Sequence, residues 1–366
     1  MDSFKLSHAV TFPLFLVLLL YLYTVESLCC FDRVFSFGDS MTDTGNACRL
    51  VDGKCAALKP PFGETYFHQP NGRHSDGRLI VDFIAQAYGL PPISPSMGGN
   101  TPEYFQNGAN FAVAAARALN NSAYRKVTGM DPPFPQDHSL RIQLQSFKDL
   151  LPIISQGSSV NAVMSSSLFV VGEIGGVEYV FGLGSKKSVD EMKSWVPYIV
   201  AAIGSAVNDL INLGATTLIV PGNYAIGCAP SYMTQFRSNN NEDYDIKTGC
   251  LKSLNEFTVY HNTMLRKELD KQKITHPLAQ IIYADYYGAQ SQLYLNKLDF
   301  PAPLYACCGG PGPYNFSTTI QCGDKGSQSC PNPENYISWD GSHLTEAANH
   351  AIADGILYGP FAIPPL

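Results

Sequence analysis

Charged side chains are scarce in this sequence. Asp, Glu, Lys and Arg make up 15% of its 366 residues, against about 25% in an average soluble domain. The net charge at pH 7 is −7, and no cluster of Lys or Arg interrupts this acidic balance. A protein that binds nucleic acid needs a basic patch to meet the phosphates. We therefore expect no nucleic-acid partner.

The spacings that gather several ligands around one zinc ion are also missing. The sequence contains no Cys-x-x-Cys pair and no His-Glu-x-x-His motif, both of which are typical of zinc sites. We predict no metal site and no cofactor.

The 10 cysteines are an even number, which suits disulfides in an oxidising compartment. Cys48 and Cys55 could close a short loop, and Cys228 and Cys250 a longer one. Four others crowd a Gly/Pro-rich segment: Cys307, Cys308, Cys322 and Cys330. The sequence does not specify how these four pair, nor how Cys29 and Cys30 pair.

Residues 1–27 have the features of a signal peptide. Lys5 supplies a positive charge, Phe12 to Tyr23 form an apolar run, and Val25 to Ser27 offer small residues for cleavage. The apolar run is shorter than the roughly 20 residues of a membrane-spanning helix. We expect a cleaved signal peptide, no stable membrane anchor and a secreted, extracellular protein, with the vacuole as the other destination.

The mature chain, residues 28–366, is expected to form one domain. Its hydrophobic content of 45% is ample for a large core, although length alone would permit two domains. Asn120 and Asn315 begin Asn-x-Ser sequons, which predict glycosylation in an exported protein. The sequence does not indicate an oligomeric state.

Short apolar runs alternate with segments of helical periodicity. Val34 to Phe37 and Thr216 to Val220 are two of the runs, and Arg141 to Ile154 and Leu251 to Lys271 are two of the helical segments. Nearly continuous apolar strands that alternate with helices indicate a parallel sheet covered on both faces. The fold class is therefore α/β.

The stretch FSFGDSMTDTGN, residues 35–46, places Ser40 just after the first of these strands. A side chain beyond the carboxyl end of a strand, at the start of a helix, lies in the ligand crevice of an open α/β sheet. Ser40 is therefore a candidate nucleophile. The spacing of Ser40 and Asp43 fits a helix capping box equally well, so a base and an acid elsewhere must decide.

Both occur near the other end of the chain, in WDGSHLTE, residues 339–346. A nucleophilic serine needs an imidazole to take its proton and a carboxylate to orient that imidazole. Asp340 and His343 are three residues apart, and Gly341 lets the intervening turn bend tightly. Because Ser40 and this pair come from opposite ends of the chain and must meet, one domain is preferred over two.

Together, FGDSMTDTGN and WDGSHLTEAA resemble the motifs of the GDSL family in the SGNH hydrolase superfamily, and specifically its plant esterase/lipase branch. The resemblance covers nearly the whole mature chain. It implies Ser40 as nucleophile, His343 as general base and Asp340 as the residue that orients it. It also implies a three-layer α/β/α domain with a flavodoxin-like sheet of about five parallel strands.

The resemblance also implies backbone donors for the oxyanion, the N–H groups of Ser40 and Gly108. A third donor, an asparagine in a Gly-Asn-Asp motif, is replaced here by Gly176-Val177-Glu178. Valine has no donor, and losing one such group costs roughly 10²–10³ in kcat. Three explanations stand: another side chain supplies the donor, the natural acyl group needs less help, or ester hydrolysis is no longer the selected activity. We expect Glu178 to be a solvated or structural carboxylate rather than a catalytic one.

The resemblance implies an esterase that forms an acyl-Ser40 intermediate, on a small ester such as an acetylated plant metabolite or on a longer lipid ester. We expect the small ester, because the sequence shows no exposed amphipathic lid or membrane-facing stripe. An acyltransferase on the same scaffold, or a ligand-binding protein that has lost hydrolysis at Val177, are the alternatives. Four loops are expected to shape the pocket: Ala47 to Arg78, Leu119 to Ser139, Asn223 to Gly249 and Tyr287 to Ser338.

Overall fold

The central sheet of the computed structural model is mostly parallel. It is built from β1 (Arg33–Phe37), β2 (Gly108–Asn110), β3 (Ser167–Val171), β4 (Thr217–Pro221), β5 (Gln280–Ala284) and β8 (Ala362–Ile363). The strand order is β2-β1-β3-β4-β5-β8. The first five strands are parallel, and β8 pairs antiparallel with β5 at the edge. The 2-1-3-4-5 order of the parallel strands is flavodoxin-like.

The structure describes residues 31–296 and 298–366. Phe31–Leu366 form one unit. The predicted signal peptide and the cysteines at positions 29 and 30 lie outside the described residues.

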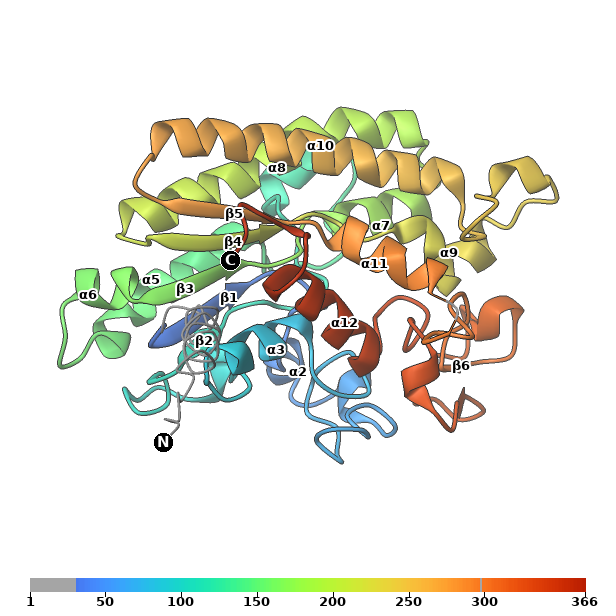
Figure 1. Ribbon diagram of the computed structural model, residues 1–366, viewed down its shortest axis with the longest axis horizontal. Helices are drawn as coiled ribbons and strands as arrows, with labels where there is room; N and C mark the ends of the chain where they lie inside the picture. The colour runs from blue at the N-terminus through green and yellow to red at the C-terminus, as the bar shows by residue number, and fades with distance from the viewer. Residues whose placement is uncertain (1–30, 297) are drawn as a thin grey trace, which may run out of the picture. The chain divides into compact units, whose positions relative to one another are not determined.

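Helices cover both faces of the sheet, so the predicted three-layer α/β/α class is confirmed (Figure 1). One face carries α4 (Asn121–Thr128), α5 (Leu140–Ile154), α8 (Val189–Asn212) and α10 (Lys252–Thr275). The other carries α3 (Ile80–Ala87), α11 (Tyr286–Leu295) and α12 (Glu346–Leu357). The remaining α-helices of the described chain are α2 (Asn46–Leu50), α6 (Val160–Ser165), α7 (Gly176–Gly184) and α9 (Pro230–Gln235).

The alternation of side chains along the strands separates two hydrophobic clusters. Phe35 and Phe37 on β1 point to the α5 face, where their ring centroids lie 5.0 and 5.8 Å from that of Phe147. Val34, which precedes Phe35 on β1, points to the opposite face and belongs to the cluster under α3 and α12. Because both faces of β3 and β4 are buried along their whole length, these strands carry apolar residues at successive positions.

Helix α8 has the length and apolar composition of a membrane-spanning helix. It begins with a capping box in which Ser188 and Glu191 exchange hydrogen bonds of 3.2 and 2.9 Å. Half of its most apolar window is buried within the domain, and α8 packs along α10 (Figure 1). This packing is that of a core helix.

Four disulfides join parts of the described chain. The expected pairs Cys48–Cys55 and Cys228–Cys250 are confirmed. The crowded cysteines pair as Cys307–Cys330 and Cys308–Cys322. The latter bridge spans 14 residues, a loop length for which closure entropy stabilises the fold by about 3 kcal/mol. Between these cysteines, β6 (Cys308–Gly309) and β7 (Gln328–Ser329) form a small second sheet.

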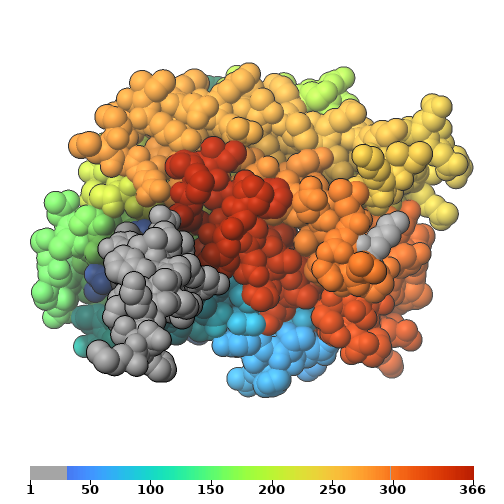
Figure 2. All heavy atoms as spheres, in the orientation of Figure 1, coloured from blue at the N-terminus to red at the C-terminus, as the bar shows by residue number. Residues whose placement is uncertain are grey.

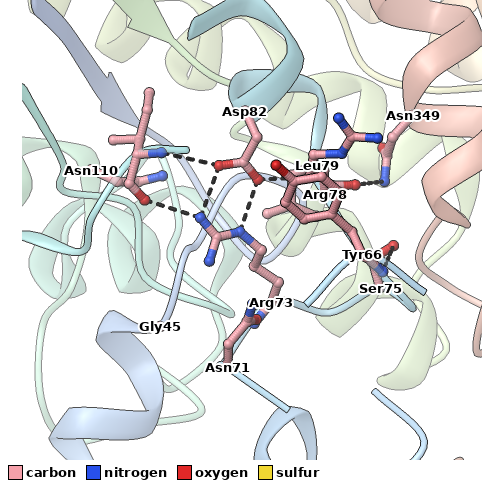
Figure 3. A network of polar contacts seen from close by, with 12 residues as sticks. Gly45, Tyr66, Asn71, Arg73, Ser75, Arg78, Leu79, Asp82, Asn110 and Asn349 are labelled. Carbon is pink, nitrogen blue, oxygen red and sulfur yellow. Dashed lines mark hydrogen bonds and ion pairs between the residues drawn. The ribbon is translucent and has the colours of Figure 1, made fainter. Parts of the chain in front are cut away.

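A buried ion pair anchors the loop that precedes α3. Arg73 meets Asp82 on α3 through two hydrogen bonds of 2.8 Å, and Asp82 also accepts the Leu79 N–H at 3.0 Å (Figure 3). Arg78, at the end of the same loop, pairs with Glu346 of α12 at 2.6 Å. In Figure 2 the red C-terminal part of the chain accordingly borders the light-blue loop. The two contacts fix this loop beside the C-terminal motif.

Candidate active site

Ser40 lies in a turn beyond the carboxyl end of β1. The chain leaves the strand at Gly38, whose N–H and carbonyl are both held by Gln143, at 2.9 and 2.8 Å. Helix α2 begins only at Asn46, and Asp43 caps it by accepting the N–H groups of Gly45 and Asn46 at 2.7 Å each. The capping-box interpretation of Ser40 is therefore wrong, and the expected helix start at Ser40 is a turn.

The side chains of Ser40, His343 and Asp340 form a continuous hydrogen-bonded chain. His343 Nε2 lies 2.8 Å from Ser40 Oγ, and His343 Nδ1 lies 2.7 Å from Asp340 Oδ2. The other carboxylate oxygen of Asp340 accepts the backbone N–H groups of Ser342 and His343, at 3.0 and 2.8 Å. Gly341 makes this turn at φ +97°, where a Cβ would lie 2.3 Å from the Phe316 ring.

The electrostatics of this chain favour an ionised acid and a basic imidazole. Burial disfavours the charged form of Asp340, but the charge and hydrogen bonds of His343 outweigh it and hold the pKa of Asp340 well below its ordinary value. Burial likewise opposes charge on His343, yet the Asp340 charge and hydrogen bond raise its pKa above 6.5. An imidazole with this raised pKa is a stronger proton acceptor for a serine.

Gly108 does not reach this site, contrary to the prediction from the family resemblance. Its N–H donates to the Phe105 carbonyl at 3.0 Å, and it pairs with Val34 near the amino end of β1. Ser40 follows the opposite end of the same strand. A Cβ on Gly108 would lie 2.0 Å from the Val34 carbonyl oxygen, so the glycine permits close strand pairing.

Ala115, which follows β2 in the chain, lines the cavity where Gly108 does not. It lines the same cavity as Ser40 and has φ +63°, a conformation that favours glycine. Within the described residues, neither the Ser40 N–H nor the Ala115 N–H has a hydrogen-bond acceptor. Two cavity-lining residues therefore have backbone N–H groups that are not engaged elsewhere in the described chain.

The triad opens into a cavity of about 390 Å³ with a largely apolar wall. Val177 lies in this wall, 8% exposed, at the first turn of α7. Val180, Phe181 and Leu183 of the same helix continue it. Glu178 points elsewhere, since it is fully buried and accepts the Leu119 N–H at 2.9 Å. The structural assignment of Glu178 agrees with this contact.

Two buried carboxyl groups, Asp39 and Glu173, also line the cavity. Their exposed fractions are 2% and 4%, and the backbone N–H of Asp39 donates to the Glu173 carbonyl at 3.2 Å. Burial raises the pKa of Asp39 to about 6, and burial followed by the Asp39 charge raises the pKa of Glu173 well above 4.5. Both carboxyl groups therefore hold a proton more tightly than an exposed carboxyl group does.

The expected pocket loops contribute unequally. His74, Phe316 and the segment from Tyr224 to Gln235 line the cavity, as does Gln290. The segment from Leu119 to Ser139 contributes no lining residue among those described, whereas α7 forms a wall that extends from the predicted position of Val177 to Val180, Phe181 and Leu183. Gln290 belongs to α11, so part of the predicted loop Tyr287 to Ser338 is a helix.

Both sequon asparagines are partly exposed. Asn120 caps α4 by accepting the Ala123 N–H at 2.9 Å, and Asn315 donates its amide to the Ala306 carbonyl at 2.8 Å. Glycosylation at either position stays a prediction.

A family model described as GDSL-like lipase/acylhydrolase matches residues 34–356. The chain belongs to the GDSL lipase/acylhydrolase family. The Arabidopsis thaliana protein GDSL esterase/lipase At1g28600 is 44% identical over 341 residues, which cover 92% of this chain and 86% of that relative. GDSL esterase/lipase At2g27360 from the same plant is 43% identical over 343 residues, with coverage of 92% and 86%. This GDSL protein is accordingly a carboxylic ester hydrolase.

Three residues of this GDSL hydrolase's cavity had not been singled out from the sequence: Ala115, Glu173 and His74. Glu173 follows the buried strand β3, and a charged residue just beyond a strand end is a usable signal for a site in an α/β sheet. Ala115 gives no such signal, because alanine does not mark a left-handed position. His74 lies in a loop without periodicity, and only tertiary contacts bring it to His343.

Proposed function

We propose that this GDSL hydrolase cleaves a small carboxylic ester through an acyl-Ser40 intermediate. The observation that carries the proposal is the continuous chain from Asp340 through His343 to Ser40, with contacts of 2.7 and 2.8 Å. Distances of this kind are those of a nucleophile bonded to its base and a base bonded to its orienting acid.

The reaction proceeds in two halves. Ser40 Oγ bonds to the ester carbonyl carbon while His343 Nε2 takes the hydroxyl proton. The carbon–oxygen bond to the alcohol breaks, and His343 returns the proton to the leaving alcohol. Water then attacks the acyl-Ser40 carbonyl with His343 again as base, the bond to Oγ breaks, and the carboxylic acid leaves. Asp340 holds the ring and stabilises its charged form in both halves.

The tetrahedral intermediate places a negative charge on the former carbonyl oxygen. The N–H groups of Ser40 and Ala115 are fixed, unengaged donors on residues that line the cavity, and such donors stabilise that charge without reorganising. Val177 adds no third donor but presents an isopropyl group to the cavity. The acyl part of the substrate is therefore apolar and lies against α7.

The cavity volume supports a small-molecule substrate. At about 390 Å³ it falls near the lower end of the roughly 300–1,000 Å³ typical of small-ligand pockets. We propose a secreted location as well, since four disulfides in the described chain suit an oxidising compartment.

The test is acid release from p-nitrophenyl acetate and p-nitrophenyl butyrate by the mature protein, with Ser40→Ala as the control. We expect wild-type turnover and a loss of at least 10³-fold in the variant. Adding glycerol separates hydrolysis from acyl transfer, because an acyltransferase forms the glycerol ester in place of the acid. Equal rates for wild type and Ser40→Ala contradict the acyl-Ser40 mechanism.

A further inference from the structure

A second histidine lies in the cavity and takes no part in the reaction described above. His74 lines the cavity together with Ser40 and His343. Its ring centroid lies 4.8 Å from that of His343, with 37° between the ring planes. At this distance the two imidazoles are in van der Waals contact, so His74 forms the part of the cavity wall next to the catalytic base.

The His74 side chain is held in place from several sides. The ring of Phe62 lies 6.2 Å away in an edge-to-face arrangement, and Trp339 packs behind Phe62 at 6.0 Å. The neighbouring Arg73 is fixed by its two hydrogen bonds to Asp82 (Figure 3). Rigid support of this kind orients a polar group before the ligand arrives.

His74 is neutral under the conditions in which His343 works. Burial, followed by the charge of the neighbouring His343, lowers the pKa of His74 to about 3. A base with so low a pKa does not compete with His343 for the serine proton. Neutral imidazole carries one N–H donor and one acceptor nitrogen, so His74 can recognise a ligand by hydrogen bonding without adding charge.

The two ring nitrogens of His74 have different surroundings. Nδ1 is buried and has no hydrogen-bond partner in the part of the chain that the structure describes. Orphaned buried N–H groups are rarer than under-satisfied acceptors, which places the proton on Nε2. The described residues offer Nε2 no acceptor, and this N–H is free for a ligand in the cavity.

His74 lies on the leaving-group side of the reaction. His343 Nε2 must reach both Ser40 Oγ and the oxygen of the departing alcohol, because it transfers the proton from one to the other. The alcohol therefore lies against the His343 ring, where His74 also makes contact. The acyl part lies against Val177 and α7, on the apolar wall.

We propose that His74 determines specificity for the alcohol half of the substrate by donating its Nε2–H to a hydroxyl oxygen of that half. The preferred substrates are then esters of polyhydroxylated alcohols with an apolar acyl group. This inference rests on the proposed function, since it assigns the leaving-group side from the role of His343. A phenylalanine at position 74 would fill the same space and lose the donor.

Two esters isolate this contact, glycerol 1-monobutyrate and propyl butyrate, which share the acyl group and differ by two hydroxyls. Their dissociation constants are first measured by NMR titration on Ser40→Ala, which does not turn them over. We expect the glycerol ester to bind three- to tenfold more tightly, as one hydrogen bond provides. Adding His74→Phe should abolish the preference, and adding His74→Gln, which keeps a donor, should restore part of it.

His350→Phe is the matched control, because His350 also stacks on an aromatic ring, Phe83 at 4.6 Å, but on α12 outside the cavity. It should leave the preference unchanged. A preference that survives His74→Phe, or two esters that bind Ser40→Ala equally, overturns the assignment of His74. If His74 only packs against its neighbours, His74→Phe weakens the binding of both esters alike. The ratio of their dissociation constants then stays the same.

The ratio of kcat/KM for the same two esters, measured without the Ser40→Ala change, tests the proposed function separately. We expect His74→Phe to lower this ratio by the same three- to tenfold. Binding preference in Ser40→Ala with no turnover of either ester by wild type supports the role of His74 and contradicts the esterase mechanism.

Discussion

His343 and Ser40 are 303 positions apart in the chain, yet His343 Nε2 lies 2.8 Å from Ser40 Oγ. The contact exists because β1 leads into the turn that carries Ser40, and the residues before α12 return to the carboxyl end of the same strand. Arg78 and Glu346, paired at 2.6 Å, hold the two segments together beside the site. The nucleophile and its base are therefore correctly placed only when both ends of the domain are folded.

The acid limb of the pH–rate profile should lie above pH 6.5. Catalysis requires neutral His343, and its pKa is raised above the ordinary 6.5 because Asp340 outweighs the opposing effect of burial. Activity should then rise with pH through the raised pKa. Asp340→Asn removes the largest effect that raises this pKa and leaves burial and the weaker Asp39 charge, so the limb should move to lower pH while kcat falls about 10⁴-fold. Steady-state kinetics from pH 5 to 9 measure both effects. An unshifted limb contradicts the pairing.

Val177→Asn should restore a side-chain donor at the cavity wall. If the asparagine amide reaches the oxyanion, kcat for p-nitrophenyl butyrate should rise by about tenfold or more, since one such donor is worth roughly 10²–10³ when it is removed. Val180→Asn, on the same helix but 47% exposed, is the matched control and should give no gain. Equal rates for wild type and a folded Val177→Asn would mean that this position is not limiting.

Glu178→Gln should flatten the dependence of stability on pH. Burial raises the pKa of Glu178 from 4.5 to about 7. The folded state therefore binds the Glu178 proton more tightly than the unfolded state does. The stabilisation that results is full below pH 4.5 and is lost as the pH rises through 7. The free energy of unfolding should fall less between pH 5 and pH 8 in the variant, by on the order of 2 kcal/mol. Urea unfolding at both pH values measures this difference.

Glu103→Gln provides the comparison for that experiment, because Glu103 is exposed. It should reproduce the wild-type dependence on pH. The same slope in Glu178→Gln would show that the buried carboxyl does not titrate in this range.

The strands and long helices could be predicted because their patterns are local. The run from Val34 to Phe37 is apolar at nearly every position, and β1 is buried on both faces as such a run requires. Most of helix α11 falls in the predicted loop Tyr287 to Ser338. Polar and aromatic residues mix along Tyr286–Leu295 without a helical pattern, and the Asp285 cap is the one clear sign of a helix start. Strand β8 is two residues long, too short for any pattern.

The residues of the site also differ in how far local sequence predicts them. Ser40, Asp340 and His343 lie in short motifs, and the side-chain chemistry of these motifs indicates a role for each residue. The family resemblance alone assigned the second backbone donor to Gly108, which by itself fits an ordinary glycine before a buried strand. In the structure the cavity is lined instead by Ala115, in a left-handed conformation, and no sequence pattern marks such an alanine. His74 depends on the Arg73–Asp82 pair, a contact that forms only in the folded domain.

The most direct test of an activated Ser40 is the intact mass of the protein after exposure to a small fluorophosphonate. The reagent bonds covalently to an activated serine oxygen and releases fluoride, so it reports the nucleophile whatever the natural ester is. We expect one adduct in the wild type, mapped to Ser40 by peptide sequencing, and none in Ser40→Ala. A folded wild-type protein that gains no adduct, or an adduct that persists in Ser40→Ala, contradicts the account.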